Sequence, residues 1–498
     1  NISYVLEIKV IWMHNIKAYY IYRKYIDELL RNQNMTSSPV LQDIFTRKDY
    51  EELLKPVLKV IEENPHANLT TLRFLLFKRS GLKEIIDNFV KLTQITPGVI
   101  LDFGTFKTRD TVLCGNSQEY VMENGVLVPN PKAIEQDTIF DLASTSKLFT
   151  AISILKLHEV GLIDVFDPIT KYVPDFKNLN DVSIYDLLKF RVMIVTDTRV
   201  DSAKNKEEAE QILFGVHKKE NQNFNNAYTD MGAMVLRYVV EKVTKLPFKT
   251  FVQAVIFDPV GMKDTHLNVP KEKLDRVANE NYSTIIKSDG TDITKYDNVP
   301  GTPHDAKALA IGELDGIAPG HAGFFSTKND MLKLGKSLIK GEVLSKESVA
   351  TISDTATGFK DDEEYTRFYG SLVYLKQPDP ANLSVYPPLS GRAFMSPGFA
   401  GTTLCVDPIN EITLFIGSGR LHNRIYQIHP NQVQNIKVDE HNKKTFTLKN
   451  GEEKIICADY TKDKEVMVKL ALDLSLQYQL LEKIMPTNRE MHLVRELN

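Results

Sequence analysis

Residues 140–150 read Phe-Asp-Leu-Ala-Ser-Thr-Ser-Lys-Leu-Phe-Thr and place Ser144 three positions before Lys147. The apolar residues that follow have helical spacing, and residues three apart lie on one face of a helix. The hydroxyl and the amine can therefore share a pocket at the positive end of the helix dipole. A serine hydroxyl needs a base to become a nucleophile, and a lysine is a base only if burial lowers its pKa. The spacing indicates a nucleophilic Ser144 with Lys147 as its base.

The same Ser-x-x-Lys spacing also begins at Ser80, Ser153 and Ser337. Each of these pairs is explained as well by two polar side chains on the solvated face of a helix. Ser153 falls in the middle of an expected helix, and Ser337 precedes the end of a lysine-rich one. Only the copy at Ser144 follows an apolar run and opens a long apolar helix, so we expect the nucleophile there.

Residues 140–150 fit the pattern F-x-x-A-S-x-[ST]-K-x-[FL]-T, and in this the chain resembles the class C-like serine hydrolases. These belong to the serine β-lactamase and penicillin-binding-protein superfamily, and the resemblance runs from about residue 82 to residue 419. It implies an α/β (α+β) fold of the β-lactamase/transpeptidase type. In that fold an antiparallel sheet is flanked by helices and a mostly helical lobe is inserted. The resemblance also implies an acyl-enzyme mechanism that needs no cofactor.

Residues 226–232, Asn-Ala-Tyr-Thr-Asp-Met-Gly, resemble the family's Y-[SA]-[ND] motif and the helix after it. The resemblance places Tyr228 at the catalytic tyrosine, which relays a proton to the leaving group, and gives Asp230 the role of orienting the pair. Asp230 replaces the commoner asparagine, so it supplies an acceptor without an amide donor. The alternative interpretation is a plain helix start with Thr229 or Asp230 as its cap.

Residues 394–402, Phe-Met-Ser-Pro-Gly-Phe-Ala-Gly-Thr, resemble the family's third motif on a strand beside the active site. Ser396 and Gly398 are the expected substrate-binding residues. The backbone amides of Ser144 and Phe399 are the expected oxyanion hole. Ser396 stands where relatives carry histidine or lysine, so this position offers no cation to a substrate carboxylate. We therefore expect weak β-lactamase activity and a preference for short acyl esters.

His304 and His321 lie in segments similar to the V-H-D-x-x-A and G-H-A-G-L-F-S-T motifs of one sub-branch. A metal site or a triad histidine is one interpretation. A structural role is favoured, because the family needs neither and the glycines around His321 suit a tight turn. We expect no metal. Residues 189–193 depart from the family's T-H-T-S-G, which predicts a reshaped edge of the pocket.

The length of 498 residues suggests two lobes with additions. We expect a helical extension over residues 1–80 and the serine hydrolase domain over 81–430, with the helical lobe at about 175–320. A hairpin and a C-terminal helix are expected over 431–498. The net charge of −4 gives no indication of nucleic acid or of an anionic membrane as a partner.

The three cysteines, Cys114, Cys405 and Cys457, are far apart and form no disulfide framework. This favours a reducing compartment, and we expect the cytoplasm. Residues 1–9 resemble neither a signal peptide nor a membrane span, but the sequence lacks an initial methionine and its start can be incomplete. Nothing in the sequence predicts the oligomeric state.

The sequence therefore predicts a serine hydrolase that cleaves a small-molecule ester or amide through an acyl-enzyme on Ser144. Two alternatives remain open. One is an acyltransferase that uses the same intermediate, and the other is a catalytically silent binding protein.

Overall fold

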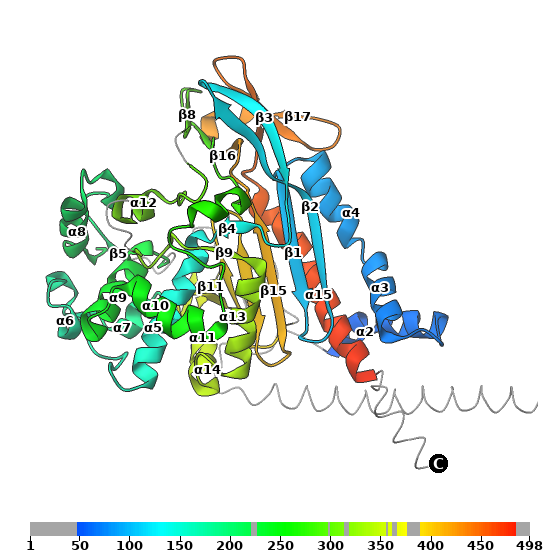
Figure 1. The fold of residues 1–498 in the computed structure, drawn as a ribbon, viewed down its shortest axis with the longest axis horizontal. Helices are drawn as coiled ribbons and strands as arrows, with labels where there is room; N and C mark the ends of the chain where they lie inside the picture. Colours follow the sequence, from blue (N-terminus) through cyan, green and yellow to red (C-terminus); the bar gives the residue numbers. More distant parts are fainter. Residues whose placement is uncertain are drawn as a thin grey trace, which may run out of the picture.

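A computed structural model describes residues 47–220, 227–296, 299–312, 318–354, 357–360, 366–375 and 389–484 (Figure 1). Residues 1–46 of the predicted extension and residues 485–498 lie outside the described parts of the chain. Within these parts, a large antiparallel sheet stands between a layer of long helices and a lobe of shorter helices (Figure 1). This is the predicted arrangement.

The large sheet has nine strands among the described residues, and all its neighbouring pairs are antiparallel. In spatial order the strands are β10 (Thr357–Lys360), β11 (Thr366–Tyr369), β12 (Tyr374–Leu375), β13 (Phe394–Pro397), β14 (Thr403–Asp407), β15 (Ile412–Ser418), β1 (Gly98–Gly104), β2 (Arg109–Glu123) and β3 (Val126–Ala133). The first and last parts of the domain meet where β1 pairs with β15, with Leu101 opposite Ile416.

The central strands are buried on both faces, and alternation along each strand divides their side chains between two cores. In β1, Ile100 belongs to the core beneath the helical lobe, whereas Leu101 belongs to the core on the other face. In β15, Phe415 and Ile416 divide in the same way. The near-continuous apolar runs of these strands follow from this double cover.

The outer face of the sheet is covered by α15 (Tyr460–Ile484), which contacts β1 and β15. Three N-terminal helices pack against α15: α2 (Arg47–Glu63), α3 (Leu69–Arg79) and α4 (Leu82–Asp87) (Figure 1). Val57 and Leu72 bring this extension into the same core as α15.

On the other face, α13 (Lys328–Lys340) lies against β14 and β15, and α14 (Lys346–Asp354) packs on α13. The helical lobe lies beyond them, around the contact between α5 (Lys147–Glu159) and α9 (Asp230–Thr244). Its remaining helices are α6 (Ile169–Tyr172), α7 (Ile184–Leu188), α8 (Lys206–Phe214), α10 (Phe248–Val252), α11 (Asp258–Val260) and α12 (Ala306–Gly312). A small pair, β5 (Ile194–Val195) and β6 (His217–Lys218), joins them.

A second, mixed sheet combines strands from separate parts of the chain. Its spatial order is β17 (Lys437–Val438), β18 (Lys444–Thr447), β19 (Glu453–Ile456), β16 (Arg424–Ile428), β7 (Thr284–Ile286) and β8 (Asp292–Thr294). β16 lies parallel to both β19 and β7. The turn at Asn450 and Gly451 joins β18 to β19 as an antiparallel hairpin.

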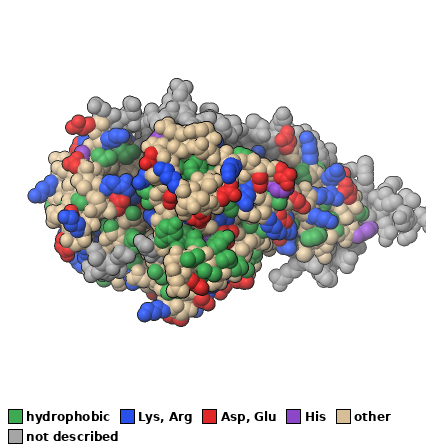
Figure 2. All heavy atoms as spheres, turned by 90° about the horizontal axis from the view of Figure 1, so that it is seen from above, with side chains coloured by type: hydrophobic (Ala, Val, Ile, Leu, Met, Phe, Trp, Pro, Cys, Tyr) green, Lys and Arg blue, Asp and Glu red, His purple; other side chains and the backbone are tan. Residues whose placement is uncertain are grey.

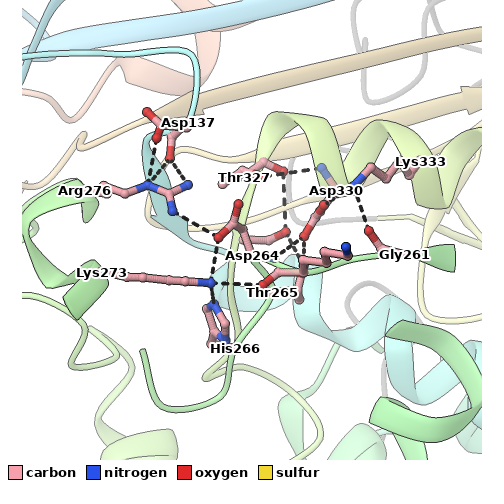
Figure 3. A network of polar contacts seen from close by, with 12 residues as sticks. Asp137, Gly261, Asp264, Thr265, His266, Lys273, Arg276, Thr327, Asp330 and Lys333 are labelled. Atoms are coloured by element: carbon pink, nitrogen blue, oxygen red, sulfur yellow. Dashed lines mark hydrogen bonds and ion pairs between the residues drawn. The ribbon is translucent and has the colours of Figure 1, made fainter. Parts of the chain in front are cut away.

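A polar network holds residues 261–265 against α13 (Figure 3). Asp330 accepts hydrogen bonds from the Asp264 amide at 2.7 Å and from the Thr265 hydroxyl at 3.1 Å. Asp264 in turn pairs with Lys273 and Arg276. This network anchors β9 (Phe325–Thr327), which pairs with β4 (Ile139–Asp141), the strand that leads to Ser144.

Charged side chains of both signs are interspersed over the end of the molecule seen in Figure 2, with a hydrophobic cluster among them. All three cysteines are buried and unpaired. No helix in the described parts of the chain has the length and apolar character needed to span a bilayer.

Candidate active site

Ser144 lies at the turn between β4 and α5. The chain leaves β4 through a 3₁₀ turn, Ala143–Ser146, that runs directly into α5. Ala143 has a φ of 43°, in the left-handed region, and its N–H donates to Asp141 Oδ1 at 2.8 Å. A non-glycine residue in this region is strained and needs support from its surroundings. The turn leaves Ser144 partly exposed and Lys147 fully buried behind it.

Lys147 connects Ser144 with two other groups. Its Nζ lies 2.7 Å from Ser144 Oγ, 2.8 Å from Asp230 Oδ1 and 3.3 Å from the carbonyl oxygen of His321. The structure thus brings together Ser144, Lys147 and Asp230, three of the four residues that the sequence predicts for catalysis. By contrast, Ser153 is buried and donates to the Phe149 carbonyl.

Tyr228 completes the predicted set. Its ring centre lies 5.0 Å from Lys147 Nζ and 4.9 Å from the ring centre of Phe190. Phe190 comes from the divergent loop 189–193 and has a φ of 52°. This loop therefore forms the support of Tyr228. Thr229 caps α9, with its Oγ1 accepting from the Met231 amide, so the helix-cap interpretation holds for Thr229 as well.

The resting charge of Lys147 differs from the sequence prediction. Burial lowers its pKa, but the attraction of Asp230 and Tyr228 outweighs burial, so the pKa of Lys147 lies above its ordinary value. Burial disfavours the charged carboxylate and on its own would raise the pKa of Asp230. Lys147 and the cationic groups beyond it instead hold that pKa well below its usual range. The expectation that burial alone lowers the pKa of Lys147 was wrong, because Asp230 carries a charge that asparagine would not.

The ion pair continues away from Ser144. Lys307 Nζ lies 3.1 Å from Asp230 Oδ2 and 3.3 Å from Asp305 Oδ2. Asp305 Oδ1 is 2.8 Å from His321 Nε2 and also accepts the Ala308 amide. Sequence reasoning missed Asp305 and Lys307, although both lie in the 304–308 motif.

Metal-ligand atoms of Asp230, Asp305 and His321 all lie within 4.8 Å of one another. Lys147 and Lys307 already pair with these carboxylates. A metal cation there would have to displace two ammonium groups, so the cluster is better described as an ion-pair network than as a metal site.

The third-motif strand is held close to the nucleophile turn. Thr145 Oγ1 donates to the Ser396 carbonyl at 2.9 Å. A Cβ atom on Gly398 would lie 2.4 Å from both the Leu142 oxygen and Thr402 Oγ1, so this approach requires glycine. Gly398 and Phe399 line the same cavity as Ser144, in keeping with their predicted positions. The Ser396 side chain is buried outside that lining, so its backbone, and not its hydroxyl, faces the nucleophile turn.

His304 has a structural environment. Its backbone N–H donates to Asp141 Oδ2 at 2.9 Å, and its ring Nε2 lies 3.0 Å from Ser283 Oγ. Burial and the charge of Lys295 lower the pKa of His304 to about 3. The imidazole is therefore neutral at ordinary pH. The backbone of His304 supports the turn that carries Ser144, because Asp141 accepts both its N–H and the N–H of Ala143.

The cavity at Ser144 has a volume of about 680 Å³. The second sheet supplies part of its wall through Ile285 and Tyr426. Its cationic lining was not predicted, because the residues lie far apart in the sequence. These are Arg199, Lys295, Lys307, Arg420 and Lys464.

Comparisons with known proteins agree with this architecture. A Salmonella heidelberg (strain SL476) protein with the provisional name D-alanyl-D-alanine carboxypeptidase is 24% identical over 356 residues, covering 64% of this chain and 77% of that protein. Among solved structures, D-amino acid amidase from Ochrobactrum anthropi superposes with a TM-score of 0.53 at 16% identity, covering 79% and 97% of the two chains. A hydrolase with promiscuous acyltransferase activity superposes with a TM-score of 0.53 at 14% identity, covering 79% and 98%. These structural likenesses concern the fold.

The family model described as Beta-lactamase matches residues 117–438. This match spans more than half of the chain and includes every residue that we predicted for the active site. The fold and the sequence agree, and the chain belongs to the Beta-lactamase family.

Proposed function

We propose that this chain is a serine hydrolase that forms an acyl-enzyme on Ser144 and cleaves an ester or amide. The observation that carries the proposal is the position of Lys147 Nζ, 2.7 Å from Ser144 Oγ and 2.8 Å from Asp230 Oδ1. A buried amine at this distance from a partly exposed serine meets the geometric requirement for an activated nucleophile.

In the proposed reaction, Ser144 Oγ attacks the substrate carbonyl while its proton moves to neutral Lys147. The backbone amides of Ser144 and Phe399 stabilise the oxyanion. When the tetrahedral intermediate collapses, the proton passes from Lys147 by way of Tyr228 to the leaving alcohol or amine. Water then attacks the acyl-enzyme by the same route, releasing the acid and restoring the Ser144 hydroxyl.

Lys147 must lose a proton before it can accept one from Ser144. Because Asp230 holds the pKa of Lys147 above its ordinary value, only a small fraction of the free enzyme has the neutral amine near pH 7. The acylation rate should therefore rise with pH well beyond neutrality.

The names of the relatives favour acyl transfer to water, and one of them favours a second candidate. They include a carboxypeptidase, an amidase and a hydrolase with promiscuous acyltransferase activity. An acyltransferase would use the same intermediate with an alcohol or amine in place of water. Product analysis with an added alcohol acceptor separates the two, because a transferase forms the new ester in preference to the free acid.

A fluorophosphonate probe tests the proposal. Wild-type protein should be labelled, and Ser144→Ala should lose labelling. Ser80→Ala is the matched control, because Ser80 also precedes a lysine by three residues but donates to the Phe77 carbonyl on α3. Labelling that persists in Ser144→Ala would contradict the proposal, and an unlabelled wild type would favour the catalytically silent alternative.

We also propose that the chain consists of the extension 1–80, the hydrolase domain 81–430 and the addition 431–498, and that residues 47–80 and α15 complete the outer face of the domain. The contacts of α2 and α3 with α15 support this division. The second sheet further joins β17, β18 and β19 to β16 and β7 of the domain.

A further inference from the structure

The ion-pair network at Lys147 closes into a ring. Lys147 Nζ lies 2.8 Å from Asp230 Oδ1, and Lys307 Nζ lies 3.1 Å from Asp230 Oδ2. Asp305 lies 3.3 Å from Lys307 Nζ through one oxygen and 2.8 Å from His321 Nε2 through the other. The carbonyl oxygen of His321 then returns to Lys147 Nζ at 3.3 Å. The ring joins α5, α9 and α12 to the segment at residue 321, so four separate parts of the chain position Lys147.

The segment that carries His321 is packed closely between α5 and α9. Thr150 Oγ1, on α5, donates to the Gly320 carbonyl at 2.6 Å. Gly320 has a φ of 92°, and a Cβ atom there would lie 2.7 Å from the Ala233 carbonyl oxygen on α9. His321 Nδ1 is buried and has no hydrogen-bond partner among the described residues. Asp305 is therefore the side-chain anchor of this segment.

The charges alternate around the ring. Burial lowers the pKa of Lys307, but Asp230 and Asp305 outweigh burial and raise it, so Lys307 is a cation. Burial on its own would raise the pKa of Asp305, but His321 and Lys307 hold that pKa well below its usual range. The Asp230 carboxylate thus lies between two ammonium groups, and each of them contacts a different oxygen.

Arg199, Asp201 and Lys295 face the ring from the lining of the same cavity. Arg199 and Asp201 pair with each other at 2.6 Å, and Lys295 donates to the His304 carbonyl at 3.2 Å. Lys307 makes its ion pairs within the ring itself, so its charge acts first on the ring.

Two cations that contact one carboxylate share its attraction. Burial lowers the pKa of Lys147 and both Asp230 and Tyr228 raise it, so a second cation on Asp230 offsets part of that rise. We propose that Lys307, held in place by Asp305, is a positioning residue for the reaction, because it competes with Lys147 for the Asp230 carboxylate and so keeps more of Lys147 available as the base. This inference rests on the proposed function.

The rate of labelling by an uncharged alkyl fluorophosphonate tests this role, because the probe reacts with Ser144 directly. The second-order rate constant is measured across the neutral and mildly alkaline range. Lys307→Met removes the charge but keeps a side chain of similar length. It should displace the rising part of the profile by about one pH unit to higher pH, which lowers labelling about tenfold at a given pH. Lys307→Arg keeps the charge and should retain most of the rate.

Asp305→Asn makes the opposite change to the ring. It removes a negative charge, so it should raise the labelling rate at a given pH, whereas damage to the structure would lower that rate. In the double variant the two charge effects should offset each other, so it should be labelled faster than Lys307→Met alone. If Asp305→Asn is labelled no faster than wild type, or the double variant no faster than Lys307→Met, the proposal is overturned.

Lys273→Met is the matched control for the loss of a paired lysine. The Lys273 side chain is 26% exposed, close to the 23% of Lys307, and it pairs with Asp264 at 2.8 Å (Figure 3). Lys273 lies outside the cavity lining, so Lys273→Met should be labelled at the wild-type rate. A rate as low as that of Lys307→Met would show that the effect is not specific to the ring and would overturn the proposal.

Circular dichroism checks that each variant folds. If Lys307→Met does not fold, Asp305→Asn decides: labelling faster than wild type supports the proposal, and an equal or slower rate overturns it. Wild-type protein also separates this inference from the proposed function. A labelled wild type with unchanged rates in folded Lys307→Met and Asp305→Asn refutes the role of Lys307 alone, whereas an unlabelled wild type refutes the proposed function.

Discussion

Asp230 sets the charge of Lys147. Its carboxylate lies between Lys147 and Lys307, where an asparagine would offer an uncharged amide. The charge of Asp230 therefore holds the two lysines in place, but it also leaves less of Lys147 in the neutral form. Because Asp230 and Lys147 are close enough to titrate together, the dependence of kcat/KM on pH will reflect both groups.

Asp230→Asn should move the alkaline rise of kcat/KM to lower pH. Asp230 raises the pKa of Lys147, so removing the negative charge lowers that pKa and leaves more neutral lysine at any given pH. The profile of kcat/KM against pH for a neutral ester measures the shift. Asp201→Asn is the control, because Asp201 lines the same cavity but pairs with Arg199. An unchanged or alkaline-shifted profile in Asp230→Asn would show that Lys147 is not the base.

At this scale, the sequence could predict which residues meet but not their charge. Ser144 and Lys147 share one turn of chain, so their contact follows from helix geometry. Tyr228 and Asp230 were placed by family resemblance. The protonation of Lys147 depends on the balance between burial and pairing, which only the folded contacts determine. The cations Lys295, Arg420 and Lys464 of the cavity lining left no signal in the sequence, because three separate segments carry them.

The strand β13 is the element that closes the site beside Ser144. Hydrogen bonds of Thr145 and Thr402 hold β13 against the turn that carries Ser144. Gly398, directly after the strand, permits this close approach. A side chain at Gly398 would meet the Leu142 carbonyl, which belongs to the backbone and cannot move aside cheaply.

Gly398→Ala should destabilise the protein by about 1–3 kcal/mol, the usual effect of overpacking, and lower acylation at least tenfold. Urea unfolding and the rate of fluorophosphonate labelling measure the two effects. Gly391→Ala serves as the control, since nothing lies within 4 Å of a Cβ atom there. If Gly398→Ala labels at the wild-type rate, the close approach of β13 is not needed for the oxyanion hole.

Local patterns predicted the elements better than their long-range pairing. The helical extension expected over residues 1–80 contains α2 and α3, and the hairpin and C-terminal helix expected over 431–498 correspond to β18, β19 and α15. The second sheet was not predicted, because its parallel pairing of β16 with β7 and β19 joins distant segments and has no local signature.

In the whole molecule, the two hydrophobic cores on either side of the large sheet stabilise different parts of the fold. The core between the sheet and the helical lobe holds the residues around Ser144, and the core on the outer face holds α15 and the N-terminal helices. The extension therefore contributes to the site indirectly, because it stabilises the sheet that contains β13, the strand that leads to Phe399.

Leu72→Ala should lower the free energy of unfolding by about 2–5 kcal/mol, because Leu72 is buried between α3 and the rest of this core. Phe74→Ala, on the same helix, should change it by less than about 0.5 kcal/mol, because Phe74 is 57% exposed. Urea unfolding of both variants provides the comparison. Equal stabilities would mean that the extension is not part of the cooperative unit.

The most direct test of the account is to trap the intermediate itself. Wild-type protein is quenched in acid during turnover of a slow ester, digested and mapped by mass spectrometry. We predict one acyl group, with the mass of the substrate's acyl portion, on the peptide that contains Ser144, and none in Ser144→Ala. Turnover with the acyl group on another residue, or turnover that persists at the wild-type rate in Ser144→Ala, would contradict the account.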